Sequence, residues 1–392
     1  MKRLLAIIMT ATLLFSAAAC GGSNSGSTPS SSAATSGGDS NSGDAATEAF
    51  VIGGLGPLTG AAASYGISVK QGAEVAVKEI NDAGGVTAGD ITYTFELNFQ
   101  DDEHSEDKVI TAYNTLMDSG IDVLMGAVTS GPTIAVSSLS HEDGVLMITP
   151  SGSAIQCTQY DNAFRICFTD PLQGVTMANF AKDELGLSKV AVIYNNSDEY
   201  SSGMKDAFVE QANDIGLEVV ANEAFTEGDV DFSTQLTTIN NTDAEAIFCP
   251  VYYEAASYIT KQASDRGMSL QFLGCDGWDG VLGQVTDATP LEGSIILSPF
   301  LAADPAAKDF VTAYEAAYGS TPDQFAADGY DAVYTIKAAL EQAGTKDKAA
   351  LIAAMTEIEV VGTTGTFTFT AEGEPDKQAK YIIIKDGEYT AY

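Results

Sequence analysis

The stretch MGAVTSGPTIAVSSLSHEDGVLMITPSGS, residues 125–153, decides the fold that the sequence predicts. Two short apolar runs, residues 123–125 and 145–148, each end abruptly in small polar residues. The segment from Pro132 to Leu139 between them has apolar residues at helical spacing, and proline is favoured at the first position of a helix. We therefore predict a strand, a turn, a helix that begins at Pro132 and a second strand, which together form a βαβ unit.

Hydroxyl groups follow both of these predicted strands. Ser130 lies in the turn after the first strand, and Ser151 and Ser153 lie in the turn after the second. In an open parallel sheet the carboxyl ends of the strands carry the ligand site. Hydroxyl and backbone N–H groups at that edge suit a small anion, above all a carboxylate. Serines after strands also cap helices, and for Ser130 capping and binding can coexist.

The rest of the chain alternates predicted strands with predicted helices. Predicted strands cover residues 48–55, 91–100, 190–194, 217–221, 246–249, 270–274 and 293–298, and two β runs at 365–370 and 381–384 close the chain. Predicted helices cover residues 64–82, 109–117, 172–187, 204–215, 231–240, 253–267, 305–318, 325–342 and 349–355. This alternation is typical of α/β proteins with parallel sheets covered on both faces. The length suits two such lobes.

The N-terminus predicts export. Two basic residues, Lys2 and Arg3, are followed by an apolar run to Phe15 that is too short to span a bilayer. This pattern indicates a signal peptide over residues 1–19. Cys20 opens a Ser/Gly-rich segment, residues 20–47, with the composition of a flexible linker. The arrangement resembles a bacterial lipoprotein signal, in which Cys20 becomes the lipidated first residue, although Ala17 stands where such signals usually have Leu. Ordinary cleavage just before the cysteine is the alternative.

The net charge and the absence of common catalytic motifs argue against several classes of function. The formal net charge is -36, so a nucleic-acid partner is not expected, because any basic patch would lie in an overwhelming negative field. The sequence has no P-loop, H-E-x-x-H or G-x-S-x-G motif, and Gly54-x-Gly56 is only a fragment of a dinucleotide loop. We therefore predict a protein that is not an enzyme and has no cofactor.

Four cysteines remain once Cys20 is assigned to lipid. An even number in an exported chain permits two disulfides, most economically Cys157 with Cys167 and Cys249 with Cys275. Four small buried thiols fit the sequence equally well. Metal binding is not predicted, since no C-x-x-C occurs and both histidines, His104 and His141, stand apart from the cysteines and are expected at the surface.

The order of elements and several strings resemble the extracytoplasmic solute-binding proteins that serve ATP-driven (ABC) importers of branched-chain amino acids. The strings are GPLTGAAASYGISVKQGAEVAVKEINDAGGV (56–86), GVLMITPSGS (144–153), FRICFTDPLQG (164–174) and DGYDAVYTIKAAL (328–340). The resemblance extends from about Phe50 to the end of the chain. It implies a two-lobed, type I periplasmic-binding-protein-like fold with three crossings between the lobes. Residues 48–170 and 298–358 would form lobe one, and residues 171–297 and 359–392 lobe two.

The same resemblance assigns the site. A zwitterionic amino acid needs donors for its carboxylate, acceptors for its ammonium and a dry pocket for its side chain. Ser130, Ser151 and Ser153 match the family's carboxylate and ammonium positions. Asp276 matches the acidic residue that pairs with the ammonium, where many relatives have Glu. Without the resemblance, an Asp beside Gly is usually a turn residue.

Aromatic residues at loop or element ends are expected to wall the pocket, because they are rigid and apolar. Tyr65, Tyr200, Tyr252 and Phe325 match pocket or lid positions of the family, and Trp278 is added because it adjoins Asp276. Core packing is the alternative for each of them.

The resemblance therefore implies a monomeric transport receptor, tethered outside the cytoplasmic membrane, that hands an amino acid to the permease of an ABC importer. Leucine, isoleucine or valine is the leading ligand class. The same fold also takes amides, urea-like and aromatic compounds, and a sensory receptor is the alternative from another functional class.

Overall fold

The computed structural model describes residues 46–392, so the predicted signal peptide, Cys20 and most of the predicted linker lie outside the described residues. The described chain builds two mainly parallel sheets. The first sheet has the order β2 (Val86–Ala88), β3 (Ile91–Asp101), β1 (Ala46–Gly56), β4 (Val123–Met125), β5 (Met147–Thr149) and β6 (Ala163–Arg165). All neighbours in it are parallel except β2 and β3. This is the α/β fold that the alternation predicts.

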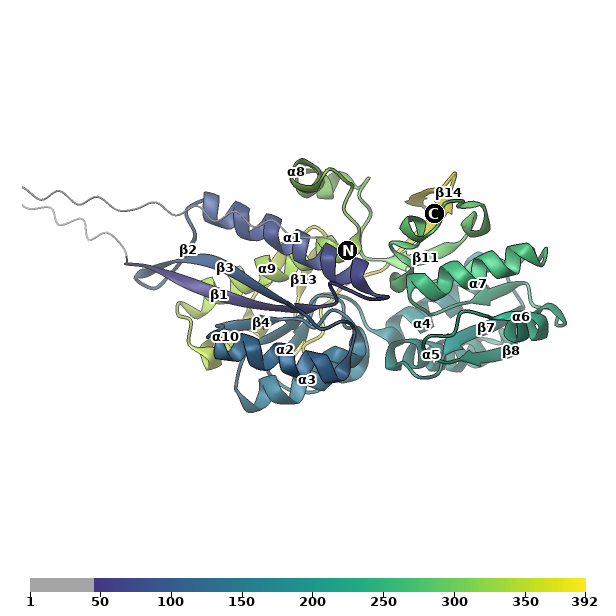
Figure 1. The fold of residues 1–392 in the computed structure, drawn as a ribbon, viewed down its shortest axis with the longest axis horizontal. Coiled ribbons are helices and arrows are strands. Elements are labelled where there is room, and N and C mark those ends of the chain that lie inside the picture. The colour runs from purple at the N-terminus through teal and green to yellow at the C-terminus, as the bar shows by residue number, and fades with distance from the viewer. Residues whose placement is uncertain (1–45) are drawn as a thin grey trace, which may run out of the picture. The chain divides into compact units, whose positions relative to one another are not determined.

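Both faces of the first sheet are covered, as the short apolar strands require. In β4, Val123 and Met125 belong to one apolar cluster and Leu124 to another, because successive side chains of a strand point to opposite faces. Figure 1 shows α1 (Ala63–Asp82) on one side of the sheet, and α2 (Glu106–Asp118) with α3 (Ser130–Glu142) on the other. Helix α9 (Gln324–Ala343) packs against α1, α10 (Lys348–Ala354) packs against α9, and α8 (Lys308–Tyr318) contacts α1.

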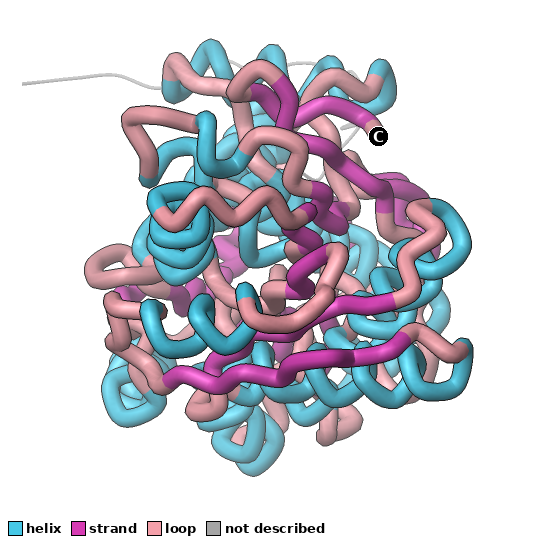
Figure 2. The backbone as a smooth tube through the Cα atoms, turned by 90° about the vertical axis from the view of Figure 1, so that its right-hand side faces the viewer, coloured by secondary structure: helices cyan, strands magenta, loops and turns pink. Residues whose placement is uncertain are grey.

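The second sheet has the order β15 (Glu388–Ala391), β14 (Lys380–Lys385), β11 (Ile295–Ser298), β10 (Gln271–Leu273), β9 (Ala246–Phe248), β7 (Lys189–Asn195) and β8 (Glu218–Phe225). Strands β14 and β15 are antiparallel additions at one edge, close to the C-terminus in Figure 2. Helix α4 (Asp170–Asn179), continued by a π-helical turn, leads into β7 from the first sheet, and α5 (Glu199–Ile215), α6 (Ser233–Asn240) and α7 (Tyr253–Asp265) connect the strands from β7 to β10. Within residues 46–392, every helix is too short or too polar to span a bilayer.

The chain passes between the two sheets three times, after β6, after β11 and after β13 (Gly365–Thr368). The hairpin of β12 (Glu359–Gly362) and β13 differs from the prediction, which put residues 359–392 wholly in lobe two. The hairpin packs on α9, where the Asp331 carboxylate accepts hydrogen bonds from the N–H groups of Thr363 (2.7 Å) and Thr364 (2.9 Å). Only β14 and β15 of this segment join the second sheet.

Helix α3 begins at Ser130, two residues before the predicted start at Pro132. Pro132 therefore occupies the first turn, where a proline is tolerated because its missing N–H would have no partner within the helix. Thr129 is the extended residue that precedes the helix. The consequence is that Ser130 belongs to the first turn of the helix and not to a preceding loop.

Of the two alternatives that the sequence leaves open, two disulfides or four buried thiols, the structure has the four buried thiols. Within the described chain Cys157, Cys167, Cys249 and Cys275 are all free and buried. The sulfur atoms face different partners: the Cys157 thiol points to the Ser130 carbonyl (3.8 Å), and the Cys275 thiol lies 2.9 Å from the Tyr200 hydroxyl. Burial raises the pKa of the Cys157 thiol to about 12, so it stays protonated.

Candidate functional site

The three predicted serines lie together at the carboxyl ends of β4 and β5, and two of them fasten the loops to each other. The Ser130 hydroxyl accepts a hydrogen bond from the Ala154 N–H (3.2 Å), and the Ser151 hydroxyl donates to the Val128 carbonyl (2.6 Å). Ser153 is completely buried, and its hydroxyl faces the Asp170 carboxyl, whose charged form it favours. The loops thus form one wall, with Ser153 and Asp170 side by side on it.

The start of α4 adds an acidic residue that the sequence analysis missed. The Asp170 N–H donates to the Ser153 carbonyl (3.0 Å), which ties the helix to the serine loop. The Asp170 carboxyl is buried, and the Ser153 hydroxyl is the side-chain group that favours its charged form most. Burial raises the pKa of this carboxyl well above its usual range. Asp170 lies inside the string FRICFTDPLQG, which is one of those that carry the family resemblance. In the sequence, however, an Asp before Pro indicates only the start of a helix.

The second sheet delivers Asp276 to the same place, at the short helical turn Asp276–Trp278 after β10. One carboxylate oxygen accepts hydrogen bonds from the Tyr200 hydroxyl (2.6 Å) and the Gly277 N–H (2.8 Å). Burial raises the pKa of Asp276, and these hydrogen bonds oppose the shift by favouring the charged form. The Asp276 N–H donates to the Gln173 side chain (3.0 Å), whose amide nitrogen is buried without a partner in the region described.

Four of the predicted aromatic residues gather beside these carboxylates. The rings of Tyr200 and Tyr252 are stacked, with centroids 4.6 Å apart and planes 7° apart. Tyr65 contacts Phe325 (centroids 4.3 Å apart) and Tyr252 (5.5 Å). The Tyr65 hydroxyl accepts a hydrogen bond from the Tyr253 N–H (2.9 Å) and donates to the Gly277 carbonyl. Tyr65 of α1 therefore bonds directly to two backbone groups of the second lobe.

Trp278, the fifth predicted aromatic residue, is a core residue. Its indole is completely buried and donates to the Cys249 carbonyl (2.8 Å). The ring lies so close to Gly274 that a Cβ there would come within 2.6 Å of it. The reason is the tight turn: residues two apart in a 3₁₀ helix point in very different directions, so Trp278 faces the second-lobe core while Asp276 does not.

His104 also differs from its prediction as a surface residue. It is partly buried, and its Nδ1 lies 2.8 Å from the Thr129 hydroxyl. Burial lowers the pKa of its imidazole, which is therefore neutral at pH 7. His141 is exposed, as predicted, and lies 3.4 Å from an Asp161 oxygen.

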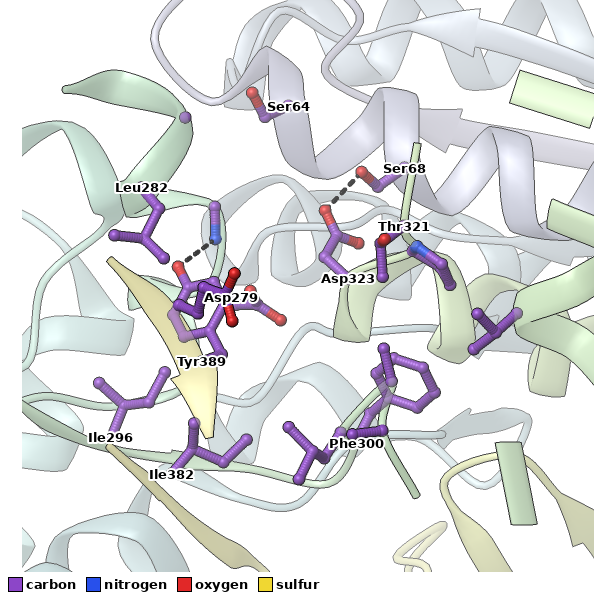
Figure 3. Close-up of a pocket in the computed structure, with 18 of the residues that line it drawn as sticks. Ser64, Ser68, Asp279, Leu282, Ile296, Phe300, Thr321, Asp323, Ile382 and Tyr389 are labelled. Atoms are coloured by element: carbon purple, nitrogen blue, oxygen red, sulfur yellow. Dashed lines mark hydrogen bonds between the residues drawn. The ribbon is translucent and has the colours of Figure 1, made fainter. Parts of the chain in front are cut away.

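A hollow of about 820 Å³ lies next to this cluster, lined by residues of both lobes (Figure 3). Asp279 and Asp323 stand on its wall: Asp279 accepts a hydrogen bond from the Gln324 N–H (2.8 Å), and Asp323 accepts one from the Ser68 hydroxyl (2.7 Å). None of Ser130, Ser151, Ser153 and Asp276 lines this hollow. A second hollow, of about 210 Å³, lies against Tyr252 and His104.

We place the candidate site at the serines and carboxylates and not in the larger hollow, because buried polar side chains of both lobes converge there: Ser153, Asp170, Gln173 and Asp276. Within residues 46–392 the Gln173 amide nitrogen has no hydrogen-bond partner. A buried polar atom destabilises the fold by about 1–3 kcal/mol unless something hydrogen-bonds to it. A small polar molecule with both a cationic and an anionic group would satisfy these side chains.

The chain matches known proteins over nearly its whole described length. A family model, described as a periplasmic binding protein, matches residues 50–384. Leu/Ile/Val-binding protein homolog 3 of Brucella melitensis biotype 1 is 34% identical over 335 residues, which is 84% of this chain and 89% of that protein.

Two solved structures share the fold. LivJ of Streptococcus pneumoniae, a branched-chain amino acid transporter substrate binding protein in complex with isoleucine, is 30% identical with a TM-score of 0.82, over 88% of this chain and 98% of that one. The leucine binding protein LivK of Thermotoga maritima is 27% identical with a TM-score of 0.81, over 88% of this chain and 97% of that one.

Proposed function

Because the chain belongs to the periplasmic binding protein family, a family of extracytoplasmic solute-binding proteins, we propose that it binds a small α-amino acid between its two lobes and delivers it to the permease of an ABC importer. A branched-chain side chain, that of leucine, isoleucine or valine, is the leading class. The names of the relatives support this choice, since the LivJ structure holds isoleucine.

One observation carries the proposal: buried polar side chains of the two lobes, Ser153, Asp170 and Asp276, are grouped with the charge pattern that an amino acid needs. Asp170 and Asp276 supply carboxylates for an ammonium group. On the other side, the first turn of α3 supplies backbone N–H groups, and within the described chain the Thr129 side chain does not cap them. The positive end of a helix and the Ser130 hydroxyl suit the ligand carboxylate.

The aromatic residues give the proposed site its selectivity for an apolar side chain. Tyr65, Tyr200, Tyr252 and Phe325 are rigid, and each makes ring contacts with another member of the set. The Tyr200 and Tyr65 hydroxyls are engaged by Asp276 and by second-lobe backbone groups. What these rings present to a ligand is therefore mainly apolar surface, which favours an aliphatic side chain over a charged one.

The same proposal includes attachment to the membrane. Lipidation of Cys20 would hold the binding domain at the outer face of the cytoplasmic membrane, with residues 20–47 as the tether. The sequence pattern at residues 1–20 supports it. Metabolic labelling with an azido fatty acid, compared between the natural chain and Cys20→Ser, tests it directly; equal labelling of both would contradict it.

A thermal-shift panel of amino acids, amides, urea and aromatic acids tests the ligand class. A ligand that binds only the native state raises Tm, by RT ln(1 + [L]/Kd) in free energy. We expect the largest shifts with leucine, isoleucine or valine. Shifts with amides or aromatic acids alone would overturn the amino-acid assignment in favour of another small solute.

Variants locate the site within the same panel. Ser130→Ala and Asp276→Asn should remove most of the shift. Ser257→Ala is the matched control, because the Ser257 hydroxyl bonds only within α7, to the Glu254 carbonyl (2.7 Å), and this variant should keep the full shift. An undiminished shift in either site variant would remove that residue from the site.

A further inference from the structure

Arg165, the last residue of β6, is a charged side chain without any exposed surface. Arginine is almost never fully buried unless its guanidinium group is paired and hydrogen-bonded. In this chain nearly all of its hydrogen-bonding capacity is directed at a single short segment, the one that carries Ser153.

The guanidinium group makes four hydrogen bonds to residues 152–158. Nη1 donates to the carbonyl oxygens of Gly152 (2.9 Å) and Ala154 (3.0 Å). Nη2 donates to the carbonyl of Ile155 (3.3 Å) and to the Thr158 hydroxyl (2.8 Å). The two carbonyl groups bound by Nη1 belong to the residues immediately before and after Ser153, so the backbone is held on both sides of that serine.

Glu374 completes the arrangement from a distant part of the sequence. One of its carboxylate oxygens lies 2.8 Å from Arg165 Nε, and the other accepts a hydrogen bond from the Thr158 hydroxyl (2.7 Å). Glu374 lies in residues 369–379, the third crossing between the lobes. The Arg165 N–H donates to the neighbouring Gly373 carbonyl (3.1 Å), so backbone and side chain both connect β6 to this crossing.

The serine loop has little regular structure of its own to hold it. Residues 150–154 lie between β5 and a single 3₁₀ turn, Ile155–Thr158. Three residues outside the loop form hydrogen bonds with it. The Ser130 hydroxyl accepts from the Ala154 N–H, the Asp170 N–H donates to the Ser153 carbonyl, and the Arg165 guanidinium group makes the bonds described above. Of these, Arg165 makes the most bonds, and its planar fork cannot be reproduced by a lysine.

We propose that Arg165 is a positioning residue, which fixes residues 152–158 so that the Ser153 hydroxyl is held toward the ligand, and that Glu374 fixes Arg165 to the third crossing. Arg165 itself does not contact the ligand; it acts through the loop. The part of the inference that concerns the ligand rests on the proposed function. The part that concerns the loop stands independently of it.

Hydrogen–deuterium exchange on the ligand-free protein tests the loop directly. In Arg165→Lys, amides of residues 152–158 should exchange at least about tenfold faster, as the loss of one or two hydrogen bonds implies, while amides of β1 and β4 keep their rates. Arg266→Lys is the matched control, since Arg266 follows α7, is exposed, and donates to the Gln262 carbonyl of α7 and to the Ser233 hydroxyl at the start of α6. It should leave the loop unchanged.

The second measurement is affinity for the amino acid that gives the largest thermal shift with the natural protein. Arg165→Lys should weaken it at least about tenfold at a temperature where both proteins are folded, and Glu374→Gln, which keeps an acceptor for Thr158, should weaken it less. Unchanged exchange at residues 152–158, or equally faster exchange throughout the protein, would overturn the proposal.

If Arg165→Lys yields no folded protein, Glu374→Gln decides by the same exchange criterion. Because that criterion uses no ligand, a failure of the amino-acid assignment leaves the test of the loop intact. Faster exchange in the loop with undiminished affinity would overturn the link to the ligand, since a loop that is loose and still binds is not positioned by Arg165.

Discussion

Replacing Tyr65 with phenylalanine should weaken ligand binding without weakening either lobe. The Tyr65 hydroxyl is a single atom of the first lobe that bonds to two backbone groups of the second, the Gly277 carbonyl and the Tyr253 N–H. Tyr65→Phe keeps the ring and its contact with Phe325 while removing both hydrogen bonds. The substitution therefore acts on the contact between lobes and leaves the packing within each of them.

The magnitude follows from the two bonds. Each hydrogen bond contributes about 1 kcal/mol net, so the arrangement with the lobes in contact loses about 2 kcal/mol relative to one in which both backbone groups face water. At 1.4 kcal/mol per factor of ten, this is about a 30-fold change in the closing equilibrium. If the ligand contacts groups of both lobes only when they meet, Kd should rise by up to the same factor.

Isothermal titration calorimetry measures that Kd, and small-angle scattering of the ligand-free protein measures the change in lobe contact. Tyr113→Phe is the matched control: its hydroxyl bonds to Asp143 (2.8 Å) between α2 and the end of α3, entirely within the first lobe. The control should lower Tm and keep Kd. Equal loss of affinity in the two variants, or no loss in Tyr65→Phe, would refute the reasoning.

Three further outcomes are expected. Binding of an ammonium-bearing ligand should release protons, because a cation beside Asp170 lowers the pKa that burial has raised and so favours ionisation of this carboxyl; calorimetry in buffers of different ionisation enthalpy measures the release, and Asp170→Asn should reduce it. Burial and the neighbouring Asp323 raise the pKa of Asp279 to about 7, so the folded state holds this proton more tightly than the unfolded state does. The free energy of unfolding, and with it Tm, should therefore fall as pH rises from about 4 to 7. Asp279→Asn should make the fall in Tm less steep, and an unchanged slope would contradict this reasoning. Dithiothreitol should leave Tm unchanged, and a maleimide should label Cys157 and Cys275 only after unfolding, whereas labelling of the native protein would contradict their burial.

The sequence predicts the fold well because a buried parallel strand has a strong local signature. Residues 123–125 and 145–148 are apolar without interruption, since both faces of their strands are covered, and the helix between them follows from spacing alone. The hairpin at residues 359–368 is harder to assign. Its β pattern would suit either lobe, and the Asp331 carboxylate, far away in sequence, decides where it packs.

For the candidate site, the resemblance supplies the positions that the structure brings together, and it does not supply residues whose role depends on spatial contact. The serines, Asp276 and four aromatic residues come together, although no local pattern relates Tyr65 to Gly277. Asp170 and Arg165 went unnoticed because their importance lies in contacts with residues 152–158 that a single sequence does not reveal. Trp278 shows the opposite case: it lies two residues from Asp276 in sequence, but a tight turn directs the two side chains apart.

The contacts between the lobes also explain why a ligand should matter to them. Tyr65 and Gln324 hold the lobes together through a few hydrogen bonds, each contributing about 1 kcal/mol. The same arrangement buries the Asp170 carboxyl and the Gln173 amide nitrogen, and burying such groups costs a comparable or larger amount. Gains and losses of similar size make the contact between the lobes sensitive to any molecule that pairs with the buried groups. A ligand that pairs the buried groups removes the cost and keeps the bonds, so it shifts the balance toward closure in proportion to what it satisfies.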